Sequence, residues 1–96
     1  MNKQLILQQL KKVKPVLTEK YGLIVLALFD SYSRSEETDL SDIDIMVDYE
    51  SPMGLKSFGM VYELKNVFKE KNVQVVSRAG IKLKYSDRIK QDLIYA

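Results

Sequence analysis

Apolar residues recur every three or four positions in the first part of the chain. The residues with this spacing are Ile6, Leu10, Val13 and Leu17. Because this spacing places them on one face of a helix, the pattern predicts an amphipathic helix over about residues 3–20. Gly22 follows as a stop signal. Pro15 lies inside the pattern and lacks an amide proton, so we expect it to kink the helix or to split it in two.

Two segments with the character of strands come next. Residues 23–29 are continuously apolar and rich in branched side chains, which is typical of a central strand covered on both faces. Residues 42–49 alternate between polar and apolar side chains, which predicts a neighbouring strand with one face toward a cleft. We expect the other face of this strand, with Ile43, Ile45 and Val47, to lie against the core.

The remainder of the chain continues the alternation. Residues 55–71 predict a second amphipathic helix, residues 72–76 a third strand and residues 86–95 a last helix, with a loop or short helix at residues 77–85. The residues expected to face inward are Leu55, Phe58, Val61, Leu64 and Phe68 in the second helix and Ile89, Leu93 and Ile94 in the last. This order predicts an α/β fold with a three-stranded or slightly larger mixed sheet flanked by helices.

The composition indicates one folded domain that spans residues 1–96. Apolar residues make up 46% of the chain and charged residues 29%, the mixture of an ordinary globular protein. Because 15 basic and 13 acidic residues are spread along the chain and leave a net charge of +2, a nucleic-acid partner is not indicated. The longest apolar run is too short to span a membrane and no signal peptide is evident, so the expected location is cytoplasmic.

Carboxylates are the main groups available for catalysis. The chain contains no histidine and no cysteine, which excludes disulfides, the usual zinc sites and catalytic triads with an imidazole base. Asp42 and Asp44 lie two positions apart on a predicted strand, so both side chains leave the same face, with Cα atoms roughly 6.6 Å apart. Because Mg²⁺ prefers oxygen ligands and borrows one or two carboxylates, this pair predicts a metal site for phosphate chemistry.

A polar turn precedes this pair of carboxylates. Because residues 31–35 directly follow the first predicted strand, we expect their amides to open a short helix and to point at phosphate groups. The hydroxyl groups of Ser31 and Ser33 add donors, and Arg34 adds positive charge if it turns toward the cleft. Tyr32 completes this predicted nucleotide-binding segment. The alternatives are a rim or core position for Tyr32 and an ordinary solvated charge for Arg34.

This segment resembles the minimal nucleotidyltransferases of the polymerase beta superfamily, whose pattern is Gly-Ser, a short helical turn and then Asp-x-Asp on the next strand. Ser31, Asp42 and Asp44 match the pattern, and the likeness continues through the next helix, the segment VQVVSR and the closing segment YSDRIKQDLIYA. The resemblance implies the small nucleotidyltransferase fold, ATP as substrate and one or two Mg²⁺ ions. It also implies transfer of AMP to a hydroxyl group, with Asp42 and Asp44 as catalytic metal ligands.

Two residues depart from the family pattern. Asp30 stands in the place of the glycine, and Gln74 stands in the place of a third carboxylate. Because Asp30 adds bulk and negative charge beside a triphosphate, it should weaken nucleotide binding or turn its side chain away, and Asp30→Gly should tighten binding. Gln74 removes a candidate base, which typically costs about 10²–10⁴ in rate. Alternatively, Asp30 replaces the missing carboxylate, in which case Asp30→Asn should abolish transfer.

The resemblance also implies a partner. Proteins of this family often act as antitoxins of a helical HEPN-domain ribonuclease toxin, which they silence by adenylylating a tyrosine. The alternative is a binding module of the same fold, degenerate at Asp30 and Gln74, that neutralises a partner without chemistry. Transfer to a small molecule such as an antibiotic is disfavoured, because 96 residues leave no second domain to hold it. No membrane is implied, and association into a homo-oligomer stays open.

Overall fold

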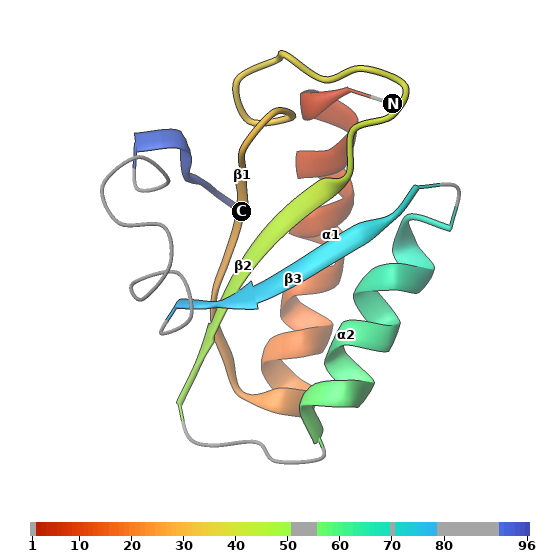
Figure 1. Ribbon diagram of the computed structural model, residues 1–96. Coiled ribbons are helices and arrows are strands. Elements are labelled where there is room, and N and C mark those ends of the chain that lie inside the picture. The colour runs from red at the N-terminus through yellow and green to blue at the C-terminus, as the bar shows by residue number, and fades with distance from the viewer. Residues whose placement is uncertain (1, 51–55, 70, 79–90) are drawn as a thin grey trace.

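The computed structural model describes residues 2–50, 56–69, 71–78 and 91–96 of the chain (Figure 1). Its elements in chain order are α1 (Lys3–Tyr21), β1 (Leu23–Phe29), β2 (Ile43–Tyr49), α2 (Lys56–Val67), β3 (Val73–Ser77) and β4 (Ile94–Tyr95). Neither helix in this described part has the length and apolar character needed to cross a membrane. These elements confirm the predicted α/β fold class. The ends of β1, β2 and β3 each lie within one residue of the predicted bounds.

The four strands form one mixed sheet in the order β3-β2-β1-β4. β1 pairs antiparallel with both β2 and β4, and β2 pairs parallel with β3. β1 is therefore an interior strand, as predicted. The register places Phe29 opposite Asp44 and Asp44 opposite Gln74. The last residue of β1 and the first residues of β2 and β3 thus meet at one end of the sheet.

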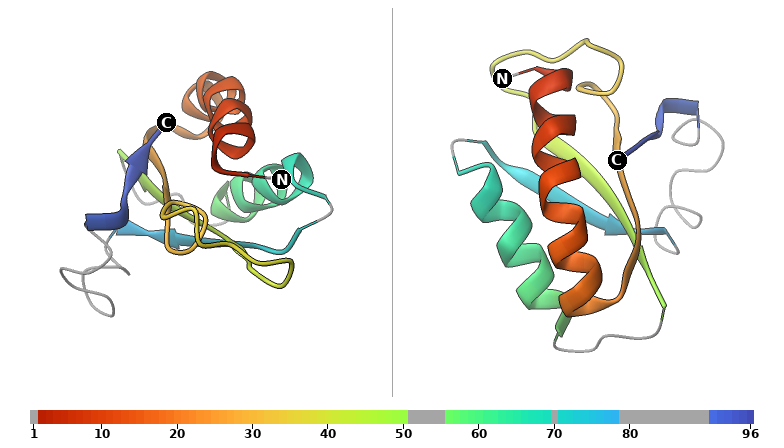
Figure 2. Two further views of the ribbon diagram at one scale, coloured as in Figure 1. Left: turned by 90° about the horizontal axis from the view of Figure 1, so that it is seen from above. Right: turned by 180° about the vertical axis from the view of Figure 1, so that it is seen from behind.

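Both helices cover the same face of the sheet, as the view from above in Figure 2 shows. The main core lies between the helices and this face, and Ile43, Ile45 and Val47 of β2 are all buried in it, as predicted. Because side chains alternate along a strand, Asp44 and Met46 of β2 point to the opposite face. This alternation keeps the aspartate pair out of the main core.

α1 begins and ends at residues that satisfy its terminal backbone groups. The Asn2 side chain accepts a hydrogen bond from the Leu5 amide at 3.0 Å, and Gly22 ends the helix with a φ of 68° and donates its amide to the Thr18 carbonyl at 3.0 Å. The helix is continuous through Pro15, so the expected division into two helices does not occur. Proline removes one amide donor, and the buried residues before and after it hold the helix against the sheet.

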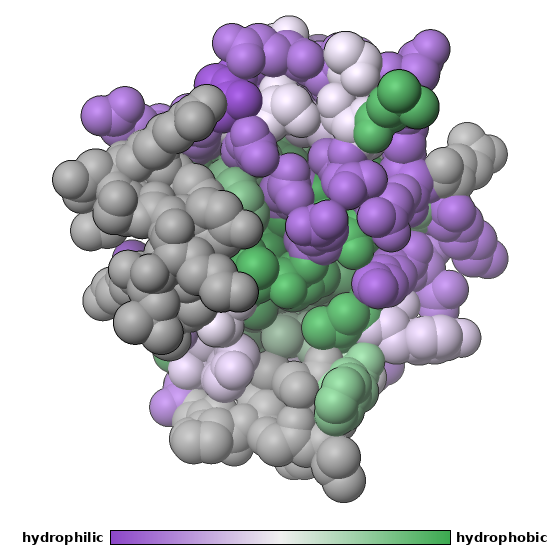
Figure 3. Space-filling view, viewed as in Figure 1, coloured by the Kyte–Doolittle hydropathy of each residue, from purple (hydrophilic) through white to green (hydrophobic). Residues whose placement is uncertain are grey.

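A smaller apolar cluster lies on the sheet face that the helices leave open. It consists of Ala27, Phe29 and Met46, with Val25, Val76 and Leu93 packed against them. Figure 3 looks onto this face and shows hydrophobic side chains gathered over the middle of the sheet, with hydrophilic side chains around them. Leu93 comes from the last segment of the chain, so that segment contacts this face as well as the edge of β1.

The predicted helix over residues 86–95 is wrong at its end. Residues 94 and 95 form β4, in which Ile94 pairs with Leu28 and Tyr95 pairs with Ala27 of β1. The Ala96 amide continues this pairing and donates to the Leu26 carbonyl at 2.8 Å. The free edge of β1 offers backbone partners to this segment, and these contacts decide its conformation. Residues 86–90 lie outside the described residues.

The inward face predicted for α2 is confirmed at Leu64 and Phe68 and wrong at Phe58. Met60, Leu64 and Phe68 are buried and recur every four residues. The inward position predicted for Phe58 is wrong, because its side chain is 71% exposed. The sequence offers two overlapping apolar stripes on this helix, and only contact with the sheet selects between them. Leu55, the first residue of the predicted stripe, lies outside the described residues.

Candidate active site

The turn that follows β1 is held by its own backbone. The Arg34 amide donates to the Asp30 carbonyl at 3.2 Å, and the Glu36 amide donates to the Ser31 carbonyl at 2.9 Å. The Ser33 hydroxyl donates to the same Asp30 carbonyl at 2.7 Å. Residues 31–35 therefore form a hydrogen-bonded turn in place of the short helix that we expected. The amides of residues 34–36 are used within this turn.

Two residues of the turn have left-handed backbone conformations. Asp30 has a φ of 64° and Ser35 a φ of 57°. This region favours glycine, because a Cβ atom crowds the following carbonyl. Asp30 thus occupies a glycine-type conformation at the position where the family pattern has glycine.

Tyr32 and Ser33 connect the turn to the protein interior. The Tyr32 side chain is 1% exposed and belongs to the main core, and Ser33 is 6% exposed. The structure therefore places the Tyr32 side chain in the core, as the alternative interpretation of this residue expected. Ser31 is the partly exposed residue before Tyr32 and Ser33, so a ligand at this turn can reach Ser31 but not the Tyr32 ring.

Asp42 and Asp44 lie beside Gln74 at the start of β2. Asp44 is half-buried and stands opposite Gln74 in the parallel pair β2 and β3. The Gln74 side-chain amide donates from Nε2 to Oδ2 of Asp42 at 3.1 Å. The structure therefore brings both aspartates together with the residue that stands in the place of the third carboxylate.

The pKa of Asp44 is raised at this end of the sheet. Burial is the largest cause that raises the pKa of Asp44 from 3.8 to about 6, and the negative charges of Asp30 and Asp42 raise it further. Asp30 directly follows Phe29, the residue that pairs with Asp44, which accounts for its influence. A cation between these groups would relieve the repulsion, so the site is electrostatically prepared for one.

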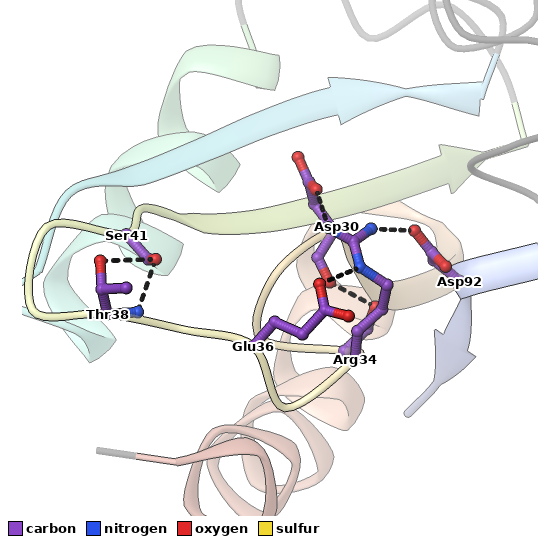
Figure 4. Close-up of polar contacts among 7 residues, drawn as sticks. Asp30, Arg34, Glu36, Thr38, Ser41 and Asp92 are labelled. Atoms are coloured by element: carbon purple, nitrogen blue, oxygen red, sulfur yellow. Dashed lines mark hydrogen bonds and ion pairs between the residues drawn. The ribbon is translucent and has the colours of Figure 1, made fainter.

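Arg34 is surrounded by three carboxylates (Figure 4). Its Nε lies 3.0 Å from Oε2 of Glu36, its Nη2 lies 3.0 Å from Oδ1 of Asp30, and its Nη1 contacts Oδ2 of Asp92. Hydrogen bonds to Glu36 and then Asp92 hold the pKa of Arg34 above its usual value. The alternative of a merely solvated charge does not hold for Arg34, because all three of its side-chain nitrogens have carboxylate partners.

Sequence reasoning missed Asp92. Its carboxylate comes from the last segment of the chain, 58 positions from Arg34, and its side chain is only 14% exposed. On the predicted last helix an aspartate would be taken for a solvated residue. The ion pair between Arg34 and Asp92 forms because the last segment of the chain pairs with β1, and no local sequence pattern predicted that contact.

The loop that leads into Asp42 has its own hydrogen bonds (Figure 4). The Thr38 amide donates to the Ser41 hydroxyl at 2.9 Å, and the Ser41 amide donates to the Thr38 carbonyl at 3.0 Å. Lys71 Nζ donates to the Asp39 carbonyl at 3.1 Å. These bonds fix the loop just before β2 and so help to orient Asp42.

The residues at this end of the sheet suit Mg²⁺. Within the described part of the chain, no group of three or more histidine, cysteine, aspartate or glutamate side chains is already arranged to hold a metal ion. Asp42 and Asp44 supply two carboxylates, and Mg²⁺ commonly takes one or two carboxylates together with waters and substrate phosphates. The donor chemistry and the raised pKa of Asp44 therefore fit a metal that arrives with a nucleotide.

A surface pocket lies between the first residues of α1 and the end of the turn after β1. It is lined by Asn2, Lys3, Gln4, Ser35 and Glu37. Only Ser35 among them belongs to the turn predicted to bind phosphate, and neither Asp42 nor Asp44 lines the pocket. The candidate active site is instead an open end of the sheet, bordered by the turn and the first residues of β2 and β3.

Comparisons with known proteins show which family this chain belongs to. Residues 10–96 match the family described as "Nucleotidyltransferase domain". The chain is 43% identical over 88 residues to "Putative protein adenylyltransferase MJ0128" of Methanocaldococcus jannaschii, which covers 90% of this chain and 89% of that protein. "Putative protein adenylyltransferase MJ0126" of the same organism is 39% identical over 90 residues, with the same two coverages. "Protein adenylyltransferase MntA" of Thermococcus cleftensis is 28% identical over 82 residues, with 85% and 83% covered.

Proposed function

The chain belongs to the nucleotidyltransferase domain family, in its minimal branch, and we propose that it transfers AMP from ATP to a hydroxyl group of a partner protein. The observation that carries this proposal is the convergence of the Asp42 and Asp44 carboxylates with the turn after β1 at one end of the sheet. A nucleotidyl transferase needs metal ligands and a phosphate site side by side, and this end of the sheet supplies candidates for both.

The reaction makes one bond and breaks one bond at the α-phosphorus of ATP. The acceptor oxygen attacks in line, pyrophosphate leaves, and the hydroxyl proton passes to a carboxylate or to solvent. Bound Mg²⁺ would neutralise the charge that develops on the phosphate oxygens. Asp42 and Asp44 would hold the metal, and their fixed place at the start of β2 would orient it relative to the nucleotide.

The turn after β1 would bind the phosphates. The amides of Arg34, Ser35 and Glu36 are used within the turn, so the phosphates would meet the earlier residues, above all Ser31, whose side chain is partly exposed. Tyr32 and Ser33 are buried, so they would shape the turn without touching the phosphates: Ser33 donates its hydroxyl to the Asp30 carbonyl, and Tyr32 belongs to the main core. Arg34 would add positive charge beside the phosphates.

The names of the relatives, "Putative protein adenylyltransferase MJ0128" and "Protein adenylyltransferase MntA", support a protein as the acceptor. We propose the more specific role implied by the family pattern, that of an antitoxin that adenylylates a tyrosine of a HEPN-type ribonuclease toxin. An acceptor of this kind arrives on its own chain. It therefore needs no second substrate-binding domain here, only access to the open end of the sheet.

A second candidate is a binding module without catalysis. It is favoured by the internal pairing of the site, because Gln74 donates to Asp42 and Arg34 binds Asp30. In that case the same end of the sheet would contact the partner, and nucleotide would play no part.

Calorimetric titration of ATP with and without Mg²⁺ distinguishes the two candidates. The enzyme proposal expects Mg²⁺-dependent binding that Asp42→Asn abolishes. The matched control is Asp48→Asn, the same replacement on β2 at a carboxylate that lies 3.5 Å from Arg78 and outside the site. Its ATP binding should equal that of the parent chain. If the parent chain does not bind ATP and only the Gln74→Asp variant does, the result would support the binding module.

A further inference from the structure

The three carboxylates around Arg34 differ in how far they are exposed to water. The side chains of Asp30 and Glu36 are 51% and 64% exposed, whereas that of Asp92 is 14% exposed. An ion pair in water is weak and exchanges readily, but a partly desolvated pair holds its geometry. Asp92 is therefore the anchor of the guanidinium, and the other two partners can be exchanged for an arriving anion.

Asp30 connects Arg34 with the end of the sheet that carries Asp44. Its Oδ1 accepts a hydrogen bond from Nη2 of Arg34 at 3.0 Å. On its other side it neighbours Asp44, since Asp30 follows the residue paired with Asp44 in the sheet. The negative charge of Asp30 raises the pKa of Asp44, so the two carboxylates lie close enough to interact while Arg34 holds Asp30.

We propose that Arg34 is a positioning residue that controls the Asp30 carboxylate. Anchored on Asp92, Arg34 holds Asp30 in the nucleotide-free protein and exchanges it for a triphosphate oxygen when ATP binds. The released Asp30 then joins Asp42 and Asp44 as the third carboxylate toward Mg²⁺, in the role for which Gln74 supplies only an amide. This inference rests on the proposed nucleotidyl transfer. It explains how the binding of nucleotide and the binding of metal would depend on each other.

Electrostatics favours the exchange of the Asp30 carboxylate for a triphosphate oxygen at Arg34. A triphosphate carries more negative charge than a carboxylate and offers oxygens that match the planar fork of a guanidinium. Asp92 holds the side chain in place beforehand, which reduces the conformational entropy that Arg34 loses on binding phosphate. The consequence is reciprocal linkage: nucleotide should tighten metal binding, and metal should tighten nucleotide binding.

The test is metal binding measured directly, with Mn²⁺ as the probe and electron paramagnetic resonance of free Mn²⁺ as the readout. The parent chain should bind Mn²⁺ weakly alone and about tenfold more tightly with a non-hydrolysable ATP analogue. Arg34→Gln should bind Mn²⁺ about tenfold more tightly than the parent without any nucleotide, because Asp30 is released. The same gain should disappear when Arg34→Gln is combined with Asp30→Asn.

Arg34→Lys separates the release of Asp30 from the loss of a positive charge. Lysine keeps the charge but has a single nitrogen, so it cannot bind Asp92 and Asp30 with the fork geometry of arginine. It should also tighten nucleotide-free Mn²⁺ binding, by at least threefold or so. Thermal melts of each variant identify any that fails to fold.

Two further variants serve as matched comparisons. Glu36→Gln removes another carboxylate partner of the same guanidinium, and nucleotide-free Mn²⁺ binding should stay within about twofold of the parent. Asp92→Asn removes the anchor, so binding of the ATP analogue should weaken several-fold while nucleotide-free Mn²⁺ binding does not tighten.

The outcomes separate this inference from the proposed function. If Arg34→Gln tightens Mn²⁺ binding equally with and without the Asp30 carboxylate, charge alone explains it and the exchange is overturned. If the parent binds Mn²⁺ with the analogue but neither Arg34 variant gains nucleotide-free binding, the exchange fails and the proposed function stands. If neither metal nor analogue binds to the parent in any arm, both fail.

Discussion

Replacing Asp44 by asparagine should stabilise the protein at neutral pH, although the change removes a proposed metal ligand. Burial, with the charges of Asp30 and Asp42, raises the pKa of Asp44 to about 6 from its ordinary 3.8. Between these pH values the folded protein keeps a proton that the unfolded chain has lost. Stability therefore falls as the pH rises from about 4 to about 6, and the full penalty remains above pH 6.

The size of the effect follows from the two pKa values. The interval from 3.8 to about 6 corresponds to at most about 3 kcal/mol. Asp44 is only half-buried, so screening by water reduces the expected gain from Asp44→Asn to about 1–2 kcal/mol. For a domain of this size each kcal/mol raises Tm by about 4–8 °C.

Urea unfolding at a series of pH values between 4 and 8 measures this gain. The difference between Asp44→Asn and the parent chain should be near zero at pH 4 and should reach its plateau above pH 6. Asp48→Asn is the matched control, because it makes the same change on β2 at a carboxylate paired with Arg78, and it should not stabilise the protein at any pH. Saturating ATP and Mg²⁺ should narrow the difference, since they would stabilise only the parent.

Two results would refute this reasoning. A gain in Asp44→Asn that is equal at pH 4 and pH 8 would mean that ionisation of Asp44 is not its cause. A loss of stability at pH 8 would mean that the carboxylate is compensated in the folded protein, so that its neighbours do not repel it.

Three further predictions concern packing and the turn. Met60→Ala should cost about 2–5 kcal/mol in urea unfolding, because Met60 is buried, whereas Phe58→Ala should change stability by less than about 0.5 kcal/mol; equal costs would contradict the orientation of α2. Ser35→Gly should raise the free energy of unfolding by about 0.5–1 kcal/mol in thermal melts, because its φ of 57° suits glycine, and a loss would argue against strain there. Asp30→Gly should lower the pKa of Asp44 in a carboxyl NMR titration, and an unchanged pKa would show that Asp30 does not influence it.

Local patterns predicted the parts of this fold that depend on nearby residues. The alternation along β2 placed Ile43, Ile45 and Val47 in the core and left Asp44 on the opposite face, because the period of two is a property of any strand. Gly22 ends α1 for an equally local reason, the left-handed conformation at a helix end. The convergence of the turn with Asp42 and Asp44 could also be anticipated, since both follow from the antiparallel pairing of consecutive strands.

The features that escaped prediction depend on contacts between distant segments. Ile94 and Tyr95 form a strand because the edge of β1 is available to them, and their own sequence was compatible with a helix. Phe58 is exposed because contact with the sheet turns Met60, four residues before Leu64, toward the core in its place. The role of Asp92 as a partner of Arg34 follows from the same docking of the last segment.

The position of β4 has a consequence for the order in which the protein folds. β1, β2 and the turn between them are close in sequence and can form early, whereas Asp92 must find Arg34 across 58 positions. Closing so long a loop costs more chain entropy than closing the shorter connection between β1 and β2. The turn and the aspartate pair can therefore form before β4 joins the sheet, and Arg34 gains its least exposed partner only in the step that adds β4.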